Sequence, residues 1–287
     1  MLDTVETLYK KILQILNNSR VKNIYNDLNK LSIDIILSVI NKDYTYFVLN
    51  RCKNLDKNLI PQIYVIAEKI KQGVPFAYAT QKAYFYNYDF FVNENVLIPR
   101  FDTEIMVDAV IKSLKKDGEN NILDLGCGSG CIGLTLLKEV QKSKAVFVDI
   151  SMEALKVVQI NANKLNVAEK TMIIQSDWVK AIKVKNAFDV IVVNPPYISK
   201  NDTDIKWNVK QYEPHLALFA DFDGFYNYFK IFRKIKYYMD ENTCLFIEIG
   251  WKQYDKIIKI AQKYSLVLKH VHKDLQGISR ILEFVKK

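Results

Sequence analysis

Residues 121–134 read NILDLGCGSGCIGL, an apolar run that passes through closely spaced glycines into a second apolar run. The first part, 121–125, has the composition of a buried strand. Gly126, Gly128 and Gly130 allow the backbone to turn sharply and to approach a ligand closely before a helix begins. A buried strand that leads through a glycine loop into a helix predicts a parallel sheet covered by helices.

Predicted strands and helices alternate from about residue 103 onward. Strands are expected at 121–125, 144–149, 171–175, 188–193, 244–249 and 266–270, and helices include 151–165 and 225–239. This alternation is typical of an α/β fold built on a doubly wound, mostly parallel sheet.

The first part of the chain has a different pattern. Apolar side chains recur at steps of three and four, as in Val5, Leu8, Ile12 and Leu16, which predicts amphipathic helices. The sequence GVP at 73–75 interrupts this pattern, and an aromatic-rich stretch around Asn87 predicts a β-hairpin. We therefore expect a helical domain at 1–73, a linker with a hairpin at 74–100, and an α/β domain at 101–287.

Composition limits the class of protein. The chain has 287 residues, is 49% hydrophobic and carries a formal net charge of +9. It contains neither an apolar stretch of membrane-spanning length nor a basic start followed by an apolar core, so we expect a cytoplasmic protein. Four cysteines without paired C-x-x-C spacing predict neither a disulfide framework nor a metal site. The charge fits either a solvated basic surface or a docking face for RNA or a ribosomal partner.

The strand ends predict an adenosine-containing cofactor, because ligands of such sheets bind there. Asp149 ends the second strand about twenty residues after the glycines, which suits a ribose diol. The glycines satisfy both the dinucleotide pattern G-x-G-x-x-G and the pattern D-x-G-x-G-x-G of S-adenosylmethionine enzymes, and Asp124 favours the second. The expected cofactor-binding residues are Asp124, Gly126, Cys127, Gly128, Ser129, Gly130, Asp149, Asp177, Trp178 and Asn194.

Two of these residues follow the third strand. Asp177 and Trp178 are able to bracket an adenine, the carboxylate accepting from the exocyclic amine and the indole stacking on the ring. Alternatively, Asp177 is a helix N-cap and Trp178 covers the core.

The sequence NPPY at 194–197 closes the apolar run 188–193. Each proline restricts the residue before it to an extended conformation, so the strand ends in a rigid mouth that presents an amide, carbonyls and an aromatic ring. This is an acceptor site for a planar NH2 group, although a simple strand-ending loop is the alternative. We expect Asn194, Pro195, Pro196 and Tyr197 to bind substrate, with Asn194, Pro195 and Tyr197 acting in catalysis and no catalytic histidine.

Further motifs occur in a fixed order around these sites. They are FVNxxVLIPRxDTE at 91–104, YEPxxAL at 212–218, ExGWxQ at 248–253 and KDLxGxxR at 273–280. Together with the glycine loop and NPPY, the set resembles the HemK/PrmC family of peptide chain release factor glutamine methyltransferases. One departure is Gln81, where the family usually has glycine.

The resemblance implies a class I S-adenosylmethionine-dependent methyltransferase with a seven-stranded sheet in 101–287. It also implies S-adenosyl-L-methionine as cofactor, and as partner a class 1 peptide chain release factor, methylated on the glutamine of its Gly-Gly-Gln motif. The helical domain would then dock this substrate, with no stable nucleic acid partner and no membrane.

Two other functions fit parts of the pattern. Adenine amino-group methylation of DNA or RNA would use the same NH2 recognition in a basic chain. An NAD-dependent oxidoreductase would use the literal G-x-G-x-x-G but would leave NPPY unexplained. Local roles account for other residues: Asp102, Thr103 and Glu104 fit a helix start, and Cys127 and Cys131 fit small buried thiols. For Asp102, Thr103 and Glu104, a substrate role or a place in the wall of the active site is the alternative.

Overall fold

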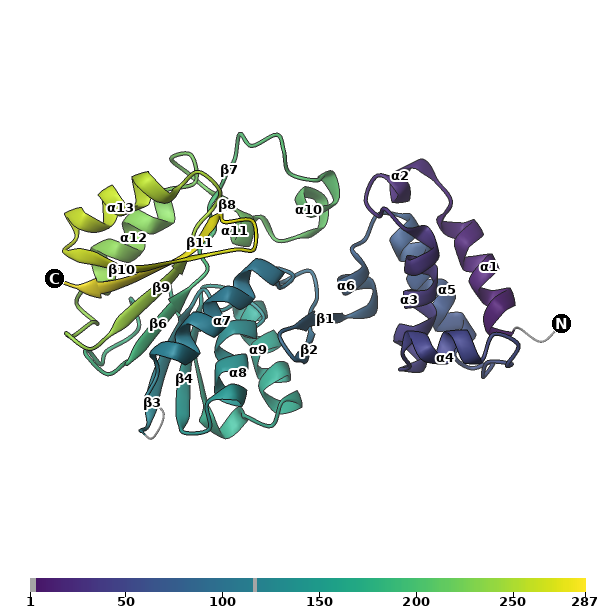
Figure 1. Ribbon diagram of the computed structural model, residues 1–287, viewed down its shortest axis with the longest axis horizontal. Helices are drawn as coiled ribbons and strands as arrows, with labels where there is room; N and C mark the ends of the chain where they lie inside the picture. Colours follow the sequence, from purple (N-terminus) through teal and green to yellow (C-terminus); the bar gives the residue numbers. More distant parts are fainter. Residues whose placement is uncertain (1–3, 116–117) are drawn as a thin grey trace. The chain divides into compact units, whose positions relative to one another are not determined.

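The computed structural model describes residues 4–115 and 118–287 and divides into two compact units (Figure 1). One unit contains the chain up to Lys82 together with Asp204–Tyr212, and the other contains Ala83–Thr203 and Glu213–Lys287. Each unit has a hydrophobic core within it.

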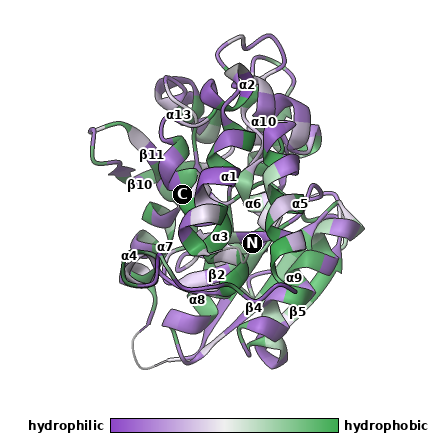
Figure 2. Cartoon of the chain, turned by 90° about the vertical axis from the view of Figure 1, so that its right-hand side faces the viewer, coloured by the Kyte–Doolittle hydropathy of each residue, from purple (hydrophilic) through white to green (hydrophobic). Residues whose placement is uncertain are grey.

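The first unit is a bundle of helices. Its helices are α1 (Val5–Leu16), α2 (Ser19–Lys22), α3 (Leu28–Ile40), α4 (Tyr44–Leu49), α5 (Ile60–Lys71), α6 (Phe76–Thr80) and α10 (Trp207–Tyr212). Thr4, Asp27 and Asp43 cap α1, α3 and α4 by accepting from backbone N–H groups. Hydrophobic and hydrophilic residues alternate along these helices (Figure 2), as expected where one face is buried.

A glycine gives α10 its place in this bundle. Gly73 has φ +101°, and a Cβ there would lie 2.2 Å from the indole of Trp207. The guanidinium of Arg20 lies 5.4 Å from the centre of the same indole, and the Tyr212 hydroxyl donates to the Gln72 carbonyl at 3.0 Å. Residues 204–212 therefore fold with the helices, although they are far from them in sequence.

The second unit contains a seven-stranded sheet in the order β10-β11-β9-β6-β3-β4-β5. The pairs among β9, β6, β3, β4 and β5 are parallel, whereas β11 is antiparallel to β9 and to β10. The predicted α/β fold with a mostly parallel sheet is confirmed. The strands are β3 (Asn120–Leu125), β4 (Ser143–Asp149), β5 (Thr171–Gln175), β6 (Val190–Val193), β9 (Cys244–Glu248), β10 (Leu266–Lys273) and β11 (Ser279–Lys286).

Helices cover both faces of the sheet (Figure 1). The helices α7 (Phe101–Ser113), α8 (Cys131–Glu139) and α9 (Met152–Lys164) contribute to one core, and α12 (Tyr226–Ile235) and α13 (Tyr254–Lys263) contribute to the other. Shorter elements are β1 (Lys82–Phe85), β2 (Tyr88–Phe91), η1 (Ala168–Lys170), β7 (Ile198–Ser199), α11 (His215–Leu218) and β8 (Phe219–Ala220). The strands β1 and β2 form the expected hairpin. No helix in the described part of the chain has the length and apolar character needed to cross a membrane.

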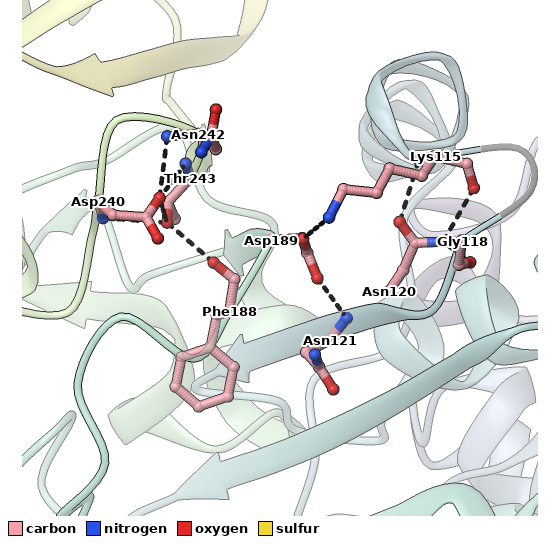
Figure 3. Close-up of polar contacts among 9 residues, drawn as sticks. All are labelled: Lys115, Gly118, Asn120, Asn121, Phe188, Asp189, Asp240, Asn242 and Thr243. Atoms are coloured by element: carbon pink, nitrogen blue, oxygen red, sulfur yellow. Dashed lines mark hydrogen bonds and ion pairs between the residues drawn. The ribbon is translucent and has the colours of Figure 1, made fainter.

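Polar contacts join the amino ends of the central strands (Figure 3). Asp189 accepts from the Lys115 ammonium at 2.7 Å and from the Asn121 N–H at 2.8 Å. Thr243 donates its hydroxyl proton to the Phe188 carbonyl at 2.8 Å. Asp189 and Phe188 are thus used in these contacts, and β6 begins at Val190, two residues later than predicted. The opposite, carboxyl ends of the strands carry the candidate site.

Candidate active site

The glycine loop connects β3 to α8 and has an open inner side. Gly126, Gly128 and Gly130 all have positive φ, at 68°, 54° and 78°. A Cβ on Gly128 would meet nothing within 4 Å, whereas one on Gly126 would lie 3.4 Å from the ring of Trp178. The loop therefore exposes its backbone at Gly128 and has an indole beside it at Gly126.

Two aspartates hold this loop. Asp124 is buried and accepts from the Gly133 N–H at 3.0 Å, and burial raises its pKa to about 7. Asp149 accepts from the N–H groups of Gly128 and Ser151, each at 2.9 Å. Burial raises the pKa of Asp149 while these N–H groups oppose the rise. Asp124 thus anchors α8, and Asp149 keeps lone pairs for a ligand hydroxyl.

A buried amide fixes the next part of the loop. Cys127 and Ser129 are buried, and the Ser129 carbonyl accepts from Asn161 Nδ2 at 2.9 Å. Asn161 also exchanges two hydrogen bonds with the backbone of Phe91, at 2.6 and 3.0 Å. Asn161 was absent from the residues predicted for the site. Its only signal in the sequence is a polar residue on the buried face of an amphipathic helix.

The structure after β5 excludes only the N-cap role for Asp177, whereas Trp178 is partly buried against the core as the second interpretation expected. Asp177 forms ion pairs with Lys180 at 2.6 Å and Lys230 at 2.9 Å, and these ammonium groups lower its pKa. No helix starts at this aspartate; a turn follows it. Trp178 has a left-handed backbone, with φ 55°, and its ring lies at the glycine loop.

Asn194 stands directly after β6 and is joined to two other elements. Its Nδ2 donates to Thr103 Oγ1 at 3.3 Å, and the Thr103 hydroxyl donates to Glu248 Oε2 at 2.6 Å. The Tyr197 hydroxyl donates to the other oxygen, Glu248 Oε1, at 3.1 Å. Burial raises the pKa of Glu248, which these two donors oppose. The ends of β6 and β9 and the first turn of α7 thus meet at one carboxylate.

The backbone of the NPPY segment is held from behind. Asn227 donates to the Pro196 carbonyl at 2.9 Å and Gln253 donates to the Tyr197 carbonyl at 3.0 Å. Among residues 4–115 and 118–287, no protein donor reaches the Pro195 carbonyl or Asn194 Oδ1. The described chain therefore leaves these two acceptors without a hydrogen-bond donor.

Comparison with known proteins identifies the family. A family model described as "Methyltransferase small domain" matches residues 102–211. A "Release factor glutamine methyltransferase" from Mycoplasma mycoides subsp. mycoides SC is 37% identical, over 86% of this chain and 88% of that protein. The chain belongs to this family of release factor glutamine methyltransferases. The resemblance drawn from the sequence motifs is confirmed.

Longer relatives and solved structures extend the comparison. A "Bifunctional methyltransferase" from Rickettsia typhi is 36% identical over 95% of this chain, but the chain spans only 57% of its length. The crystal structure of a methyltransferase from Pyrococcus furiosus matches 80% of this chain and 98% of its own, with a TM-score of 0.51 at 14% identity. This structural likeness concerns the fold alone.

The sequence motifs that flank the site form ion pairs that were not predicted. Arg100 pairs with the buried Glu213 at 2.6 Å, and Glu213 also accepts from the Ile98 N–H at 3.1 Å. Arg280 pairs with Asp102 at 3.0 Å and with Asp274 at 2.8 Å. These ion pairs join 98–102 to two distant segments of the chain.

Thr103 was predicted to help start a helix, with a substrate role or a place in the wall of the active site as the alternative, and it does lie in the first turn of α7. The cap position of α7 is Arg100, without a side-chain hydrogen bond, and Thr103 is buried against Glu248 instead. The sequence offered no local signal for this contact, because the two residues are 145 positions apart.

Proposed function

We propose that this chain transfers a methyl group from S-adenosylmethionine to the side-chain amide nitrogen of a glutamine. The substrate is the Gly-Gly-Gln motif of a class 1 peptide chain release factor. The observation that carries the proposal is the pair of open acceptors, Asn194 Oδ1 and the Pro195 carbonyl, at the end of β6. Family membership supports the choice of glutamine over other amides.

The glycine loop fits an S-adenosylmethionine molecule. A Cβ on Gly128 would meet nothing within 4 Å, so the backbone there leaves room for the cofactor. The remaining lone pairs of Asp149 would accept from its ribose hydroxyls, and the Trp178 ring, next to Gly126, would stack on its adenine. Asp177 retains a lone pair on each oxygen beside its two lysines, which suits the adenine amine. When bound, the cofactor supplies a methyl group on a positively charged sulfur, a strong electrophile.

The NPPY segment would orient the weakly nucleophilic amide nitrogen of the substrate. An amide nitrogen is a poor nucleophile because its lone pair is delocalised into the carbonyl, as in a peptide bond. Asn194 Oδ1 and the Pro195 carbonyl would each accept one N–H, which fixes rotation about the terminal bond and directs the lone pair. The flat amide would lie against Tyr197. Orientation of this kind is worth about 7 kcal/mol or more in related intramolecular reactions.

The proton needs no base on the protein before methyl transfer. The nitrogen becomes acidic only once it carries the methyl group, and it then loses the proton to solvent or to a neighbouring acceptor. Asn194 and Pro195 therefore act as acceptors that orient, and neither has to be protonated.

The helical unit is proposed to dock a second region of the release factor, which would place the protein in the cytoplasm with its substrate. The test is incubation of the purified chain with labelled S-adenosylmethionine and, separately, class 1 release factors, ribosomal proteins, DNA and RNA. Label on the Gly-Gly-Gln glutamine supports the proposal. Label on nucleic acid alone would support the adenine alternative and overturn it.

A further inference from the structure

We infer that Thr103 and Glu248 are positioning residues that permit only one orientation of the Asn194 amide. The inference rests on the proposed function, because it concerns which atom of Asn194 faces the substrate. Its basis is the chain of hydrogen bonds that runs from Glu248 through Thr103 to Asn194.

The direction of these hydrogen bonds follows from counting protons. An ionised Glu248 accepts only, and its Oε2 lies 2.6 Å from Thr103 Oγ1, so the single hydroxyl proton of Thr103 points to Glu248. Both side chains are almost fully buried, at 2% exposed for Thr103 and 3% for Glu248, so water does not supply a substitute proton. Toward Asn194, the lone pairs of Thr103 Oγ1 are therefore able only to accept a hydrogen bond.

Only the NH2 end of the Asn194 amide satisfies those lone pairs. In this orientation Nδ2 donates to Thr103 at 3.3 Å, and Oδ1, on the other side of the amide, accepts from no group in the described residues. A reversed amide would place Oδ1 against the Thr103 oxygen, lone pair against lone pair. It would also present an NH2 group to the substrate NH2 group, donor against donor.

Other groups hold Glu248 in place through both its side chain and its backbone. Its second oxygen accepts from Tyr197 at 3.1 Å, and its backbone carbonyl accepts from the Tyr228 hydroxyl at 3.0 Å. Arg280, paired with Asp102, supplies the nearby positive charge. Glu248 thereby determines the orientation of the Asn194 side-chain amide through Thr103, without contacting that amide itself.

The test compares Thr103→Val with Thr103→Ser. Valine keeps the volume but removes both the donor and the acceptor, whereas serine keeps the hydroxyl. We expect Thr103→Val to lower kcat about 10-fold to 100-fold, as small losses of alignment do, while KM for the release factor and calorimetric affinity for S-adenosylmethionine stay unchanged. Thr103→Ser should restore most of kcat.

Thr243→Val is the matched control. Thr243 is also a buried threonine with a hydrogen-bonded hydroxyl, but it donates to the Phe188 carbonyl at the opposite end of the sheet (Figure 3). It should lose stability without loss of kcat. Glu248→Gln is a second test variant, because its amide is able to donate to Thr103 and to release the hydroxyl proton. It should lower kcat with an unchanged KM.

A spectroscopic measurement separates this inference from the proposed function. In protein labelled with 15N-asparagine, the side-chain NH2 of Asn194, assigned by its absence in Asn194→Ala, should show a nuclear Overhauser contact to Thr103 without any substrate present. Absence of that contact, or equal kcat in wild type and Thr103→Val, would overturn the inference. If the contact is present but the wild type methylates no release factor, the proposed function fails and the orientation stands.

Discussion

At the scale of single residues, the proposed role of each polar group follows from which of its hydrogen-bond acceptors lack a donor within the protein. The carbonyls of Pro196 and Tyr197 have side-chain donors, whereas the described chain supplies none to the Pro195 carbonyl or to Asn194 Oδ1. Two unpaired acceptors on adjacent residues match the two hydrogens of a primary amide. The proposed reaction therefore depends on two hydrogen-bond acceptors that orient the substrate amide, and it needs no titrating base.

Removal of one of the two acceptors tests this directly. Asn194→Ala should lower kcat about 100-fold or more, the usual cost of losing a preorganised polar contact at a reacting group. Isothermal titration should show that affinity for S-adenosylmethionine is largely retained. Asn121→Ala serves as control, because its exposed side chain lies at the opposite end of the sheet. Near-normal turnover in Asn194→Ala would contradict the role of the two acceptors.

The buried Asp124 makes stability depend on pH. Its folded pKa is raised from 3.8 to about 7, so between these values the folded protein binds more protons than the unfolded chain. The free energy of unfolding should therefore fall as pH rises from about 4 to 7, on the order of a few kcal/mol from this group. Urea unfolding at pH 5 and pH 8 should show a smaller decrease for Asp124→Asn. An equal decrease in both proteins would contradict the assignment.

At the scale of secondary-structure elements, the sequence predicted those parts that depend on neighbours in the chain. The strand 171–175 is as predicted, and the strands ending at Leu125 and Asp149 start only one residue earlier. Their apolar runs and the glycine turn are local signals. The strand β11 was missed, because its pairing with β9 and β10 is set by tertiary contacts. Thr103 stands at a helix start as predicted, but its contact with Glu248 was missed for the same reason, because Glu248 lies in β9.

Gln81 shows how a departure from the family pattern is accommodated. It ends α6 with φ 55° and ψ 32°, a left-handed conformation that glycine adopts without strain. We expect Gln81→Gly to raise the free energy of unfolding by about 0.5–1 kcal/mol, because relief of strain exceeds the added entropy of the unfolded chain. Gln81→Ala retains the strain and should not stabilise. Urea denaturation of the three proteins provides the comparison, and a destabilised Gln81→Gly would contradict it.

At the scale of the whole molecule, the chain returns to its helical unit after leaving it. Residues 204–212 fold with the helical bundle and contact Gln72 and Gly73, which follow α5, although they come after the NPPY segment in sequence. Sequence patterns did not predict that residues 204–212 pack with the helical unit, because this packing depends on one indole, that of Trp207, next to Gly73. The loop after the candidate site is thereby anchored at its far end.

The close approach of Trp207 to Gly73 predicts that one added methyl group at Gly73 lowers the free energy of unfolding strongly. Gly73→Ala should destabilise the protein by about 2–4 kcal/mol, from the left-handed backbone together with overlap with Trp207. Gly277→Ala is the matched control, because Gly277 also has positive φ but has nothing within 4 Å of its added Cβ. The difference between the two variants in chemical unfolding measures the overlap alone. Equal effects would show that the indole moves aside freely.

The central claim is that the carboxyl end of β6 orients a glutamine amide for methylation. The most direct measurement is peptide mass spectrometry of a class 1 release factor after incubation with wild-type chain and S-adenosylmethionine, beside the same reaction with Asn194→Ala. The account predicts one added methyl group on the glutamine of the Gly-Gly-Gln motif with wild type, and little or none with the variant. An unmodified glutamine with the wild type, or equal methylation by both proteins, would contradict it.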